Sequence, residues 1–84
     1  MNTILWSKRA VKQARKVQTQ DRLAIVENVE TLKDFPNCRN VKRLTNHEYD
    51  YRLRVGRYRV LFDFDGSVRI VEIQEIKKRD TQTY

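Results

Sequence analysis

Apolar and polar residues change their spacing partway along the chain, which divides it into a helical part and a β part. A short apolar run over residues 3–6 suits a first strand. Apolar residues then recur at helical spacing over roughly 8–18 and 21–34, and Ser7 and Asp21 stand where residues that cap helices are preferred. In the second half of the chain, apolar and polar residues alternate, as they do in strands with one buried face.

Three further strands are expected in this second half. Gly56 supplies the first turn, and the dipeptide Asp65–Gly66 is typical of a two-residue hairpin turn. Residues 68–76 are expected to form the last strand, and residues 37–47 a loop. The pattern therefore predicts an α+β fold with the order β-α-α-β-β-β, in which a helical hairpin packs on one face of a small, mainly antiparallel sheet.

The alternation over residues 49–66 assigns side chains to the two faces of this sheet. The face toward the helices is expected to carry Tyr49, Tyr51, Leu53, Val55, Tyr58, Val60, Phe62 and Phe64. The opposite face is expected to carry Asp50, Leu61, Asp63 and four arginines, namely Arg52, Arg54, Arg57 and Arg59. Hairpin pairing places the arginines at cross-strand separations of roughly 5–8 Å.

Length and charge set the class of protein. The 84 residues suit one domain, residues 1–84, and the net charge of +7 favours a polyanionic partner such as nucleic acid. In a second interpretation, Asp50, Asp63 and Glu72 pair with the arginines on a merely solvated face. The single cysteine, Cys38, leaves no disulfide framework, which fits the cytoplasm. Because the first residues contain no long apolar run, neither a signal peptide nor a transmembrane segment is expected there.

Further cations extend the basic face. Guanidinium groups fork onto phosphate oxygens, so the arginines are candidates for phosphate binding. The end of the last strand adds Lys77, Lys78 and Arg79, of which Lys78 or Arg79 is expected at the rim of the basic face, and the chain ends in Tyr84. Further candidate binding residues are Arg39, Lys42 and Arg43 in the loop, and Lys8, Arg9, Lys12, Arg15 and Lys16 in the first helix.

Other kinds of site find little support. His47 is the one histidine and is expected to be solvated, and Cys38 has no neighbouring histidine. Metal-ligand spacing and a Gly-rich phosphate loop are both missing, so neither a metal nor a cofactor is expected. Glu72 and Glu75 are interpreted first as ion-pair partners of arginines and only then as a general base.

The chain resembles toxins of the RelE/ParE superfamily from bacterial toxin–antitoxin systems. The segment "VKRLTNHEYDYRLRVGRYRVLFDFDG" is similar to the family pattern of K-x-L followed by Y-x-x-R-L-R-x-G-x-Y-R and a strand that enters an acidic turn. The opening "ILWSKRAVKQARKV" resembles the first strand and basic helix, and "IVEIQEIKKRDTQTY" resembles the last strand with its basic end and tyrosine.

The resemblance implies a ribosome-dependent endoribonuclease. RelE-type members cut messenger RNA in the ribosomal decoding site without a metal, using the 2′-hydroxyl as nucleophile and leaving a 2′,3′-cyclic phosphate. By position, the resemblance assigns phosphate-binding and catalytic roles to Arg52, Arg59 and Lys78 or Arg79, and base stacking to Tyr84. Asp50 stands where such enzymes have a second lysine, which leaves the general base open. The other basic residues would then contact ribosomal RNA.

Two alternatives remain open beside the nuclease. One is a ParE-like toxin that inhibits DNA gyrase without cutting nucleic acid, and the other is a plain RNA-binding module. Either toxin implies a cognate antitoxin as partner, and the nuclease also implies the ribosome and mRNA. No membrane partner is expected.

Overall fold

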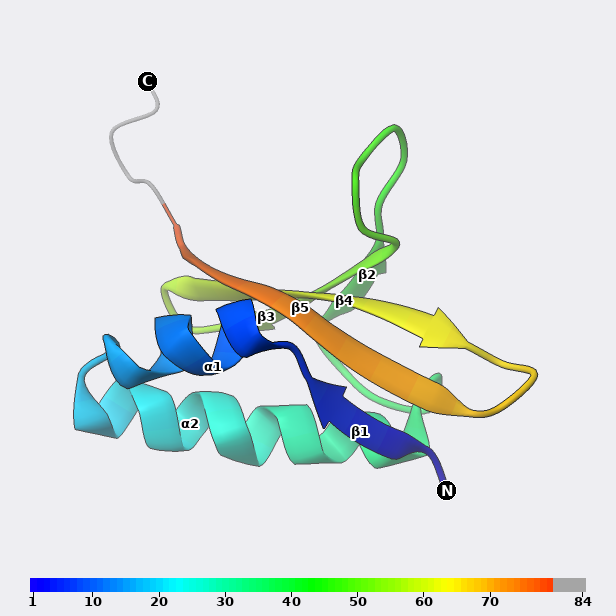
Figure 1. Ribbon diagram of the computed structural model, residues 1–84, viewed down its shortest axis with the longest axis horizontal. Helices are drawn as coiled ribbons and strands as arrows, with labels where there is room; N and C mark the ends of the chain where they lie inside the picture. Colours follow the sequence, from blue (N-terminus) through cyan, green and yellow to red (C-terminus); the bar gives the residue numbers. More distant parts are fainter. Residues whose placement is uncertain (80–84) are drawn as a thin grey trace.

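The computed structural model, which describes residues 1–79, contains two helices and a five-stranded sheet (Figure 1). The elements are β1 (Thr3–Trp6), α1 (Lys8–Arg15), α2 (Thr19–Glu30), the 3-10 helix η1 (Thr31–Asp34), β2 (Val41–Arg43), β3 (Tyr51–Val55), β4 (Tyr58–Asp65) and β5 (Ile70–Lys78). The strand order is β1-β5-β4-β3-β2, in which β1 is parallel to β5 and the other pairs are antiparallel. The predicted α+β architecture is confirmed. No helix in the described part of the chain is long and apolar enough to cross a membrane.

Both helices lie on the same side of the sheet (Figure 1). Ser7 caps α1 as predicted, because its Oγ accepts a hydrogen bond from the backbone N–H of Ala10 at 3.0 Å. Helix α2 begins at Thr19, and the residue that precedes it is Gln18, so the expected cap at Asp21 is wrong. A cap must stand before the first turn, whereas Asp21 lies inside it, where its charge suits the positive end of the helix dipole.

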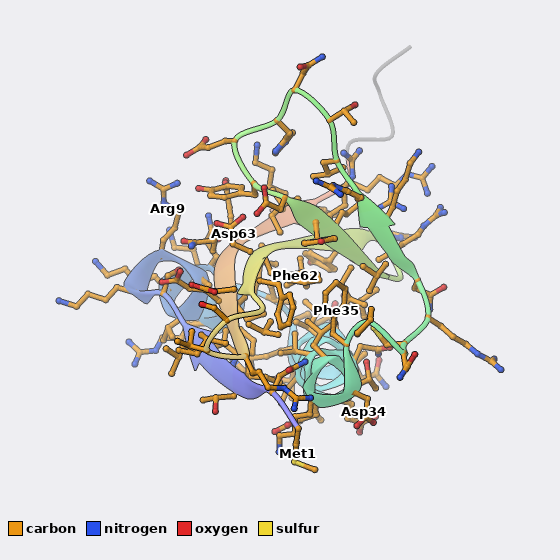
Figure 2. The ribbon with its side chains drawn as sticks, turned by 90° about the vertical axis from the view of Figure 1, so that its right-hand side faces the viewer. Met1, Arg9, Asp34, Phe35, Phe62 and Asp63 are labelled. Atoms are coloured by element: carbon orange, nitrogen blue, oxygen red, sulfur yellow. The ribbon has the colours of Figure 1, made fainter. Side chains whose placement is uncertain are left out.

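The core lies between the helices and the sheet. Phe62 is fully buried, and its ring meets Phe35 edge to face at a centroid distance of 5.5 Å and stacks on Tyr51 at 5.4 Å. Figure 2 shows Phe35 and Phe62 side by side in the middle of the molecule. The helices contribute Ala10 and Ile25, both of which are fully buried. A single apolar cluster therefore joins both layers.

Two connections differ from the expectation. The predicted loop over residues 37–47 contains the short strand β2, which pairs with β3 at the edge of the sheet. The turn between β4 and β5 has four residues rather than two, since Asp65 pairs with Ile70. The positive φ of 56° falls on Arg69 and not on Gly66. Instead of occupying the turn, Asp65 accepts hydrogen bonds from the N–H and hydroxyl of Ser67.

Strand β5 contains a β-bulge that reverses the alternation of its side chains. Leu61 pairs with Glu75 and Phe62 pairs with Ile73, so Gln74 is the additional residue. The buried residues of β5 are accordingly Val71, Ile73 and Ile76, with a spacing of two and then three. The residues that follow the bulge lie on the opposite face from the one that simple alternation would assign.

Beyond the end of β1, side chains at the start of α1 and within it bond to the free edge of β5. The Ser7 hydroxyl donates to the carbonyl of Gln74 at 3.0 Å, and the N–H of Ile76 donates to Oε1 of Gln13 at 2.6 Å. These bonds satisfy backbone groups of β5 that have no partner strand at this point. They also hold α1 beside β5, which brings Arg9 to the border of the opposite face of the sheet.

Candidate functional site

The candidate site is the outer face, the face of the sheet turned away from α1 and α2. Strand pairing places its side chains in three rows. The first, called the basic row, consists of Arg54, Arg59 and Lys77. The middle row consists of Lys42, Arg52, Leu61 and Glu75. The third, called the acidic row, consists of Asp50, Asp63 and Glu72. The face is therefore basic at one end and acidic at the other.

The basic row places three cations directly opposite one another on three strands. Arg59 lies between Arg54 on β3 and Lys77 on β5, and all three residues are exposed. Among the described residues, Arg54 and Arg59 form no ion pair, while Lys77 Nζ lies 3.9 Å from Glu75 Oε2. Like charges in such positions repel one another, so this row is suited to receive an anion.

Among the described residues, Asp50, Asp63 and Glu72 form no ion pair with an arginine, contrary to the second interpretation of this face. Asp63 Oδ1 accepts the N–H of Asp50 at 2.9 Å, and its Oδ2 accepts the side-chain amide of Gln74 at 3.3 Å. Asp63 is four residues from Arg59 along β4, a separation of roughly 13 Å at the rise of a β-strand. The carboxylates of the acidic row are thus held together at the far end of the face.

The middle row is partly covered by the loop that joins β2 and β3. Leu61 is 3% exposed and Tyr49 is 8% exposed, although neither belongs to the main core cluster. Arg9 Nη1 donates to the hydroxyl of Tyr49 at 3.3 Å and lies 3.9 Å from Glu75 Oε1. Tyr49 therefore belongs to the outer face, and its expected place among the residues facing the helices is wrong. The loop carries it back over the sheet, and strand alternation does not extend to position 49.

Burial raises the pKa of Tyr49, and the carboxylate of Glu48 raises it further. The phenol is consequently un-ionised at neutral pH and can donate a hydrogen bond. His47 lies in the same loop, where its Nδ1 accepts the N–H of Tyr49 at 3.1 Å. The pKa of the Cys38 thiol is also raised, first by burial and then by Asp34, so this cysteine is not an activated nucleophile.

The end of β5 places its cations on different sides of the sheet. Lys77 pairs with Arg59 on the outer face, whereas Lys78 pairs with Tyr58 and lies on the side of the helices. The bulge at Gln74 is the cause of this exchange. Arg79 follows β5, and its N–H donates to the carbonyl of Arg57 beside the turn. The role expected for Tyr84, stacking on a base at the site, concerns a position outside the described residues.

The other basic residues surround the basic row without belonging to it. Lys42 lies opposite Arg52, while Arg43 lies opposite Tyr51 and therefore faces the side of the helices. The cations of α1 are exposed beside β5, and Figure 2 shows Arg9 pointing away from the core. Exposed cations also lie in the turn before β4 and in the loop before β2, at Arg57 and Arg39.

Sequence reasoning underrated two residues of this face, Tyr49 and Glu75. The signal that could have located Glu75 was the spacing of Val71, Ile73 and Ile76, because a change from two to three indicates a bulge. No comparable signal marks Tyr49. Within residues 1–79, no group of three or more His, Cys, Asp or Glu side chains is placed to hold a metal ion.

Comparison with known proteins places this fold in a toxin family. The sequence model of the family described as "ParE toxin of type II toxin-antitoxin system, parDE" matches residues 4–83 of this chain. A sequence search of curated proteins found no match.

Three solved structures show the same fold. The RelBE2 toxin–antitoxin complex of Mycobacterium tuberculosis contains a chain with 26% identity and a TM-score of 0.79, over 93% of this chain and 98% of that one. A chain of the archaeal RelE–RelB complex of Pyrococcus horikoshii has 24% identity and a TM-score of 0.81, over 95% of this chain and 97% of that one. The isolated E. coli RelE toxin has 15% identity and a TM-score of 0.82, over 99% of this chain and 89% of that one. With a family match over nearly its whole length, the chain belongs to the ParE toxins of type II toxin–antitoxin systems, within the RelE/ParE superfamily.

Proposed function

We propose that this toxin is a ribosome-dependent endoribonuclease that cuts mRNA without a metal ion and so inhibits translation in the cytoplasm. The observation that carries the proposal is the basic row. Arg59 stands between Arg54 and Lys77 on an exposed face, and among the described residues neither arginine is paired with a carboxylate. A phosphate that bound here would relieve the repulsion between the three cations.

The reaction needs few groups from the protein. The 2′-oxygen attacks the neighbouring phosphorus, the bond between phosphorus and the 5′-oxygen breaks, and the products are a 2′,3′-cyclic phosphate and a 5′-hydroxyl. Negative charge develops on the non-bridging oxygens and on the leaving oxygen, and cations held in place stabilise it. Arg59 is proposed to hold the scissile phosphate, with Lys77 beside the leaving oxygen and Arg52 in the adjacent row.

An exposed face explains the need for the ribosome. The basic row does not itself enclose the substrate, so the ribosome would hold the mRNA in the geometry that the attack requires. The basic residues around the site would dock ribosomal RNA through its phosphates, which positions the toxin without reading sequence. These residues are Lys8, Arg9, Lys12, Arg15, Lys16, Arg39, Lys42, Arg43, Arg54 and Arg57. Lys78 and Arg79, at the end of β5, are proposed to contact RNA phosphates beside these docking residues. Tyr84 is proposed to stack on a base.

A cognate antitoxin is the proposed protein partner. Similar chains from M. tuberculosis and P. horikoshii were solved in toxin–antitoxin complexes. In this chain Leu23 and Val26 of α2 are 57% and 42% exposed, and Val11 of α1 is 36% exposed. Apolar side chains exposed on a helix suit an amphipathic segment of a partner.

Gyrase inhibition is the second candidate function. Two observations favour it, namely the match to the ParE family model and the place of Asp50. Asp50 lies in the acidic row and supplies no cation, whereas the RelE-type pattern has a lysine at that position. A ParE-like protein would bind its target through the same basic face without cutting nucleic acid.

One reconstituted assay separates these functions. Purified toxin, treated with EDTA and then freed of it, is added to a defined translation system that retains the magnesium of its ribosomes, and new mRNA ends are mapped. Codon-phased cuts that disappear with Arg59→Ala and persist with Arg22→Ala, a control on α2, would support the nuclease. Intact mRNA together with loss of gyrase supercoiling would contradict it. Equal cutting of free RNA would remove the ribosome from the proposal.

A further inference from the structure

Glu75 is the carboxylate of the outer face that lies closest to the basic row. It is two residues from Lys77 along β5, and its Oε2 is 3.9 Å from Lys77 Nζ. In the register it is paired with Leu61, so it is diagonal to Arg59. Diagonal neighbours on antiparallel strands lie roughly 7–8 Å apart, a distance that a ribose and its phosphate can bridge. Asp63, in the acidic row, lies roughly 13 Å from Arg59 along β4.

The surroundings of Glu75 hold its carboxylate in place but leave its oxygens available. Arg9 of α1 approaches Oε1 at 3.9 Å, and Lys77 approaches Oε2 at the same distance. Both distances exceed that of a hydrogen bond, so neither oxygen is committed as an acceptor to these cations. The side chain is 16% exposed. It can therefore still meet a hydroxyl group that is presented from the solvent side.

Other charged or titratable groups face this carboxylate. Tyr49, from the loop between β2 and β3, bonds to Arg9, and Arg52 of β3 stands in the same row. Arg59 of β4 lies in the basic row. Arg9 of α1 and Lys77 of β5 thus lie near the carboxylate, while Arg52 of β3 and Arg59 of β4 share its face of the sheet.

We propose that Glu75 is the proton acceptor that activates the RNA 2′-hydroxyl, an inference that rests on the nuclease function proposed above. The proton of the 2′-hydroxyl moves to a carboxylate oxygen of Glu75 as the 2′-oxygen bonds to phosphorus. The bond to the 5′-oxygen breaks, and the leaving oxygen takes a proton from a neighbouring ammonium group or from water. The proton on Glu75 then returns to solvent, and an ammonium group that gave up its proton takes one back from solvent. Both groups are thus regenerated, and no metal or further reactant is needed.

Neighbouring groups are less suited to this role. The Tyr49 phenol is un-ionised at neutral pH and already accepts a hydrogen bond from Arg9. His47 is less suited because its Nδ1 already accepts the N–H of Tyr49. In addition, it is Tyr49 rather than His47 that reaches the middle row from this loop. Asp50, which replaces the lysine of the RelE-type pattern, stands beside Asp63 in the acidic row. Glu75 thereby supplies a base on β5 that the residue at position 50 does not supply.

The first test compares Glu75→Gln with the wild type in single-turnover cleavage of ribosome-bound mRNA, with toxin in excess. Loss of a general base is expected to lower the maximal rate by about 10²- to 10⁴-fold. The half-saturating toxin concentration should change by less than about threefold, because Gln keeps the size of the side chain. The matched control is Glu27→Gln, which removes an exposed carboxylate from α2, outside the outer face, and should keep the wild-type rate. Thermal unfolding of each variant checks that the fold is retained.

The second test distinguishes proton transfer from a merely structural ion pair. Added formate or acetate should restore part of the cleavage rate of Glu75→Ala, and acetate should restore more because it is the stronger base. Chloride at the same ionic strength should have no effect. The inference is overturned if Glu75→Gln cleaves at the wild-type rate, or if its loss follows weaker binding and carboxylates do not rescue Glu75→Ala. Absence of cleavage by the wild type itself would instead reject the nuclease function.

Discussion

Arg54 and Arg59 lie directly opposite each other on β3 and β4, with both side chains on the outer face. Like charges at such a pair destabilise a sheet, and Lys77 adds a third cation on the other side of Arg59. The protein thus holds positive charge in a fixed arrangement at a cost to its own stability. That combination is expected of a binding site for an anion rather than of an ordinary solvated surface.

The first prediction concerns this cost. Arg59→Gln should raise the free energy of unfolding by about 0.2–1 kcal/mol, because it removes one of two facing like charges. Urea denaturation at low salt measures the change, which should shrink near 1 M NaCl, where the Debye length falls to about 3 Å. Arg22→Gln on α2 is the control. A loss of stability in Arg59→Gln would show that the row is not under repulsion.

The second prediction concerns the two lysines at the end of β5. Lys77 lies opposite Arg59 and Lys78 lies opposite Tyr58, on the other side of the sheet. Arg59→Ala should slow single-turnover cleavage by about 10²–10³-fold, as expected for the loss of one group that stabilises the transition state. Lys77→Ala should lower the rate more than Lys78→Ala does. The reverse order would show that the end of β5 rearranges when substrate binds.

The third prediction follows from the raised pKa of Tyr49. The folded protein favours the un-ionised phenol, so this contribution to stability is complete below the ordinary tyrosine pKa of about 10 and is lost as the pH rises through the pKa of the folded state. Ultraviolet titration of wild type and Tyr49→Phe should differ by one phenol that ionises above that ordinary value. In urea-unfolded protein the difference should move to about 10. The position of Tyr49 would be contradicted if the phenol that the variant lacks ionised at or below this value in the folded wild type.

The fourth prediction concerns Ser7, which joins α1 to the bulge of β5. Its Oγ accepts the N–H of Ala10 and donates to the carbonyl of Gln74, both at 3.0 Å. Ser7→Ala should lower the free energy of unfolding by about 1 kcal/mol, the usual cost of losing a helix N-cap. Thr45→Ala, in an exposed loop, should stay within about 0.5 kcal/mol of the wild type. Equal stability of the two variants in chemical denaturation would exclude this role of Ser7.

Local patterns were sufficient for most of the fold. Ser7 is a strong N-cap residue placed before apolar residues at helical spacing, and α1 begins where this pattern predicts. Strict alternation in β3 and β4 buries Leu53 and Val60 and leaves Arg54 and Arg59 exposed. Such features depend on residues close together in sequence, so they can be interpreted without knowledge of distant partners.

Features that depend on distant contacts were not predicted. Strand β2 has three residues, Val41–Arg43, and owes its extended form to pairing with β3. Tyr49 lies over the outer face because Arg9, 40 residues earlier, binds its hydroxyl. The turn after Asp65 is longer than the Asp–Gly dipeptide indicated, because pairing of Asp65 with Ile70 sets the length of the loop.

The amino-acid sequence by itself determined that arginines of β3 and β4 share one exposed face, because a side-chain period of two leaves no other arrangement once Leu53 and Val60 are buried. Only the tertiary structure decided which residues of β5 join them. The bulge at Gln74 brings Glu75 and Lys77 to the outer face and turns Lys78 toward the helices. The physical reason is that a bulge depends on the register with the partner strand and on the contacts of α1 with β5, and neither is encoded within a single strand.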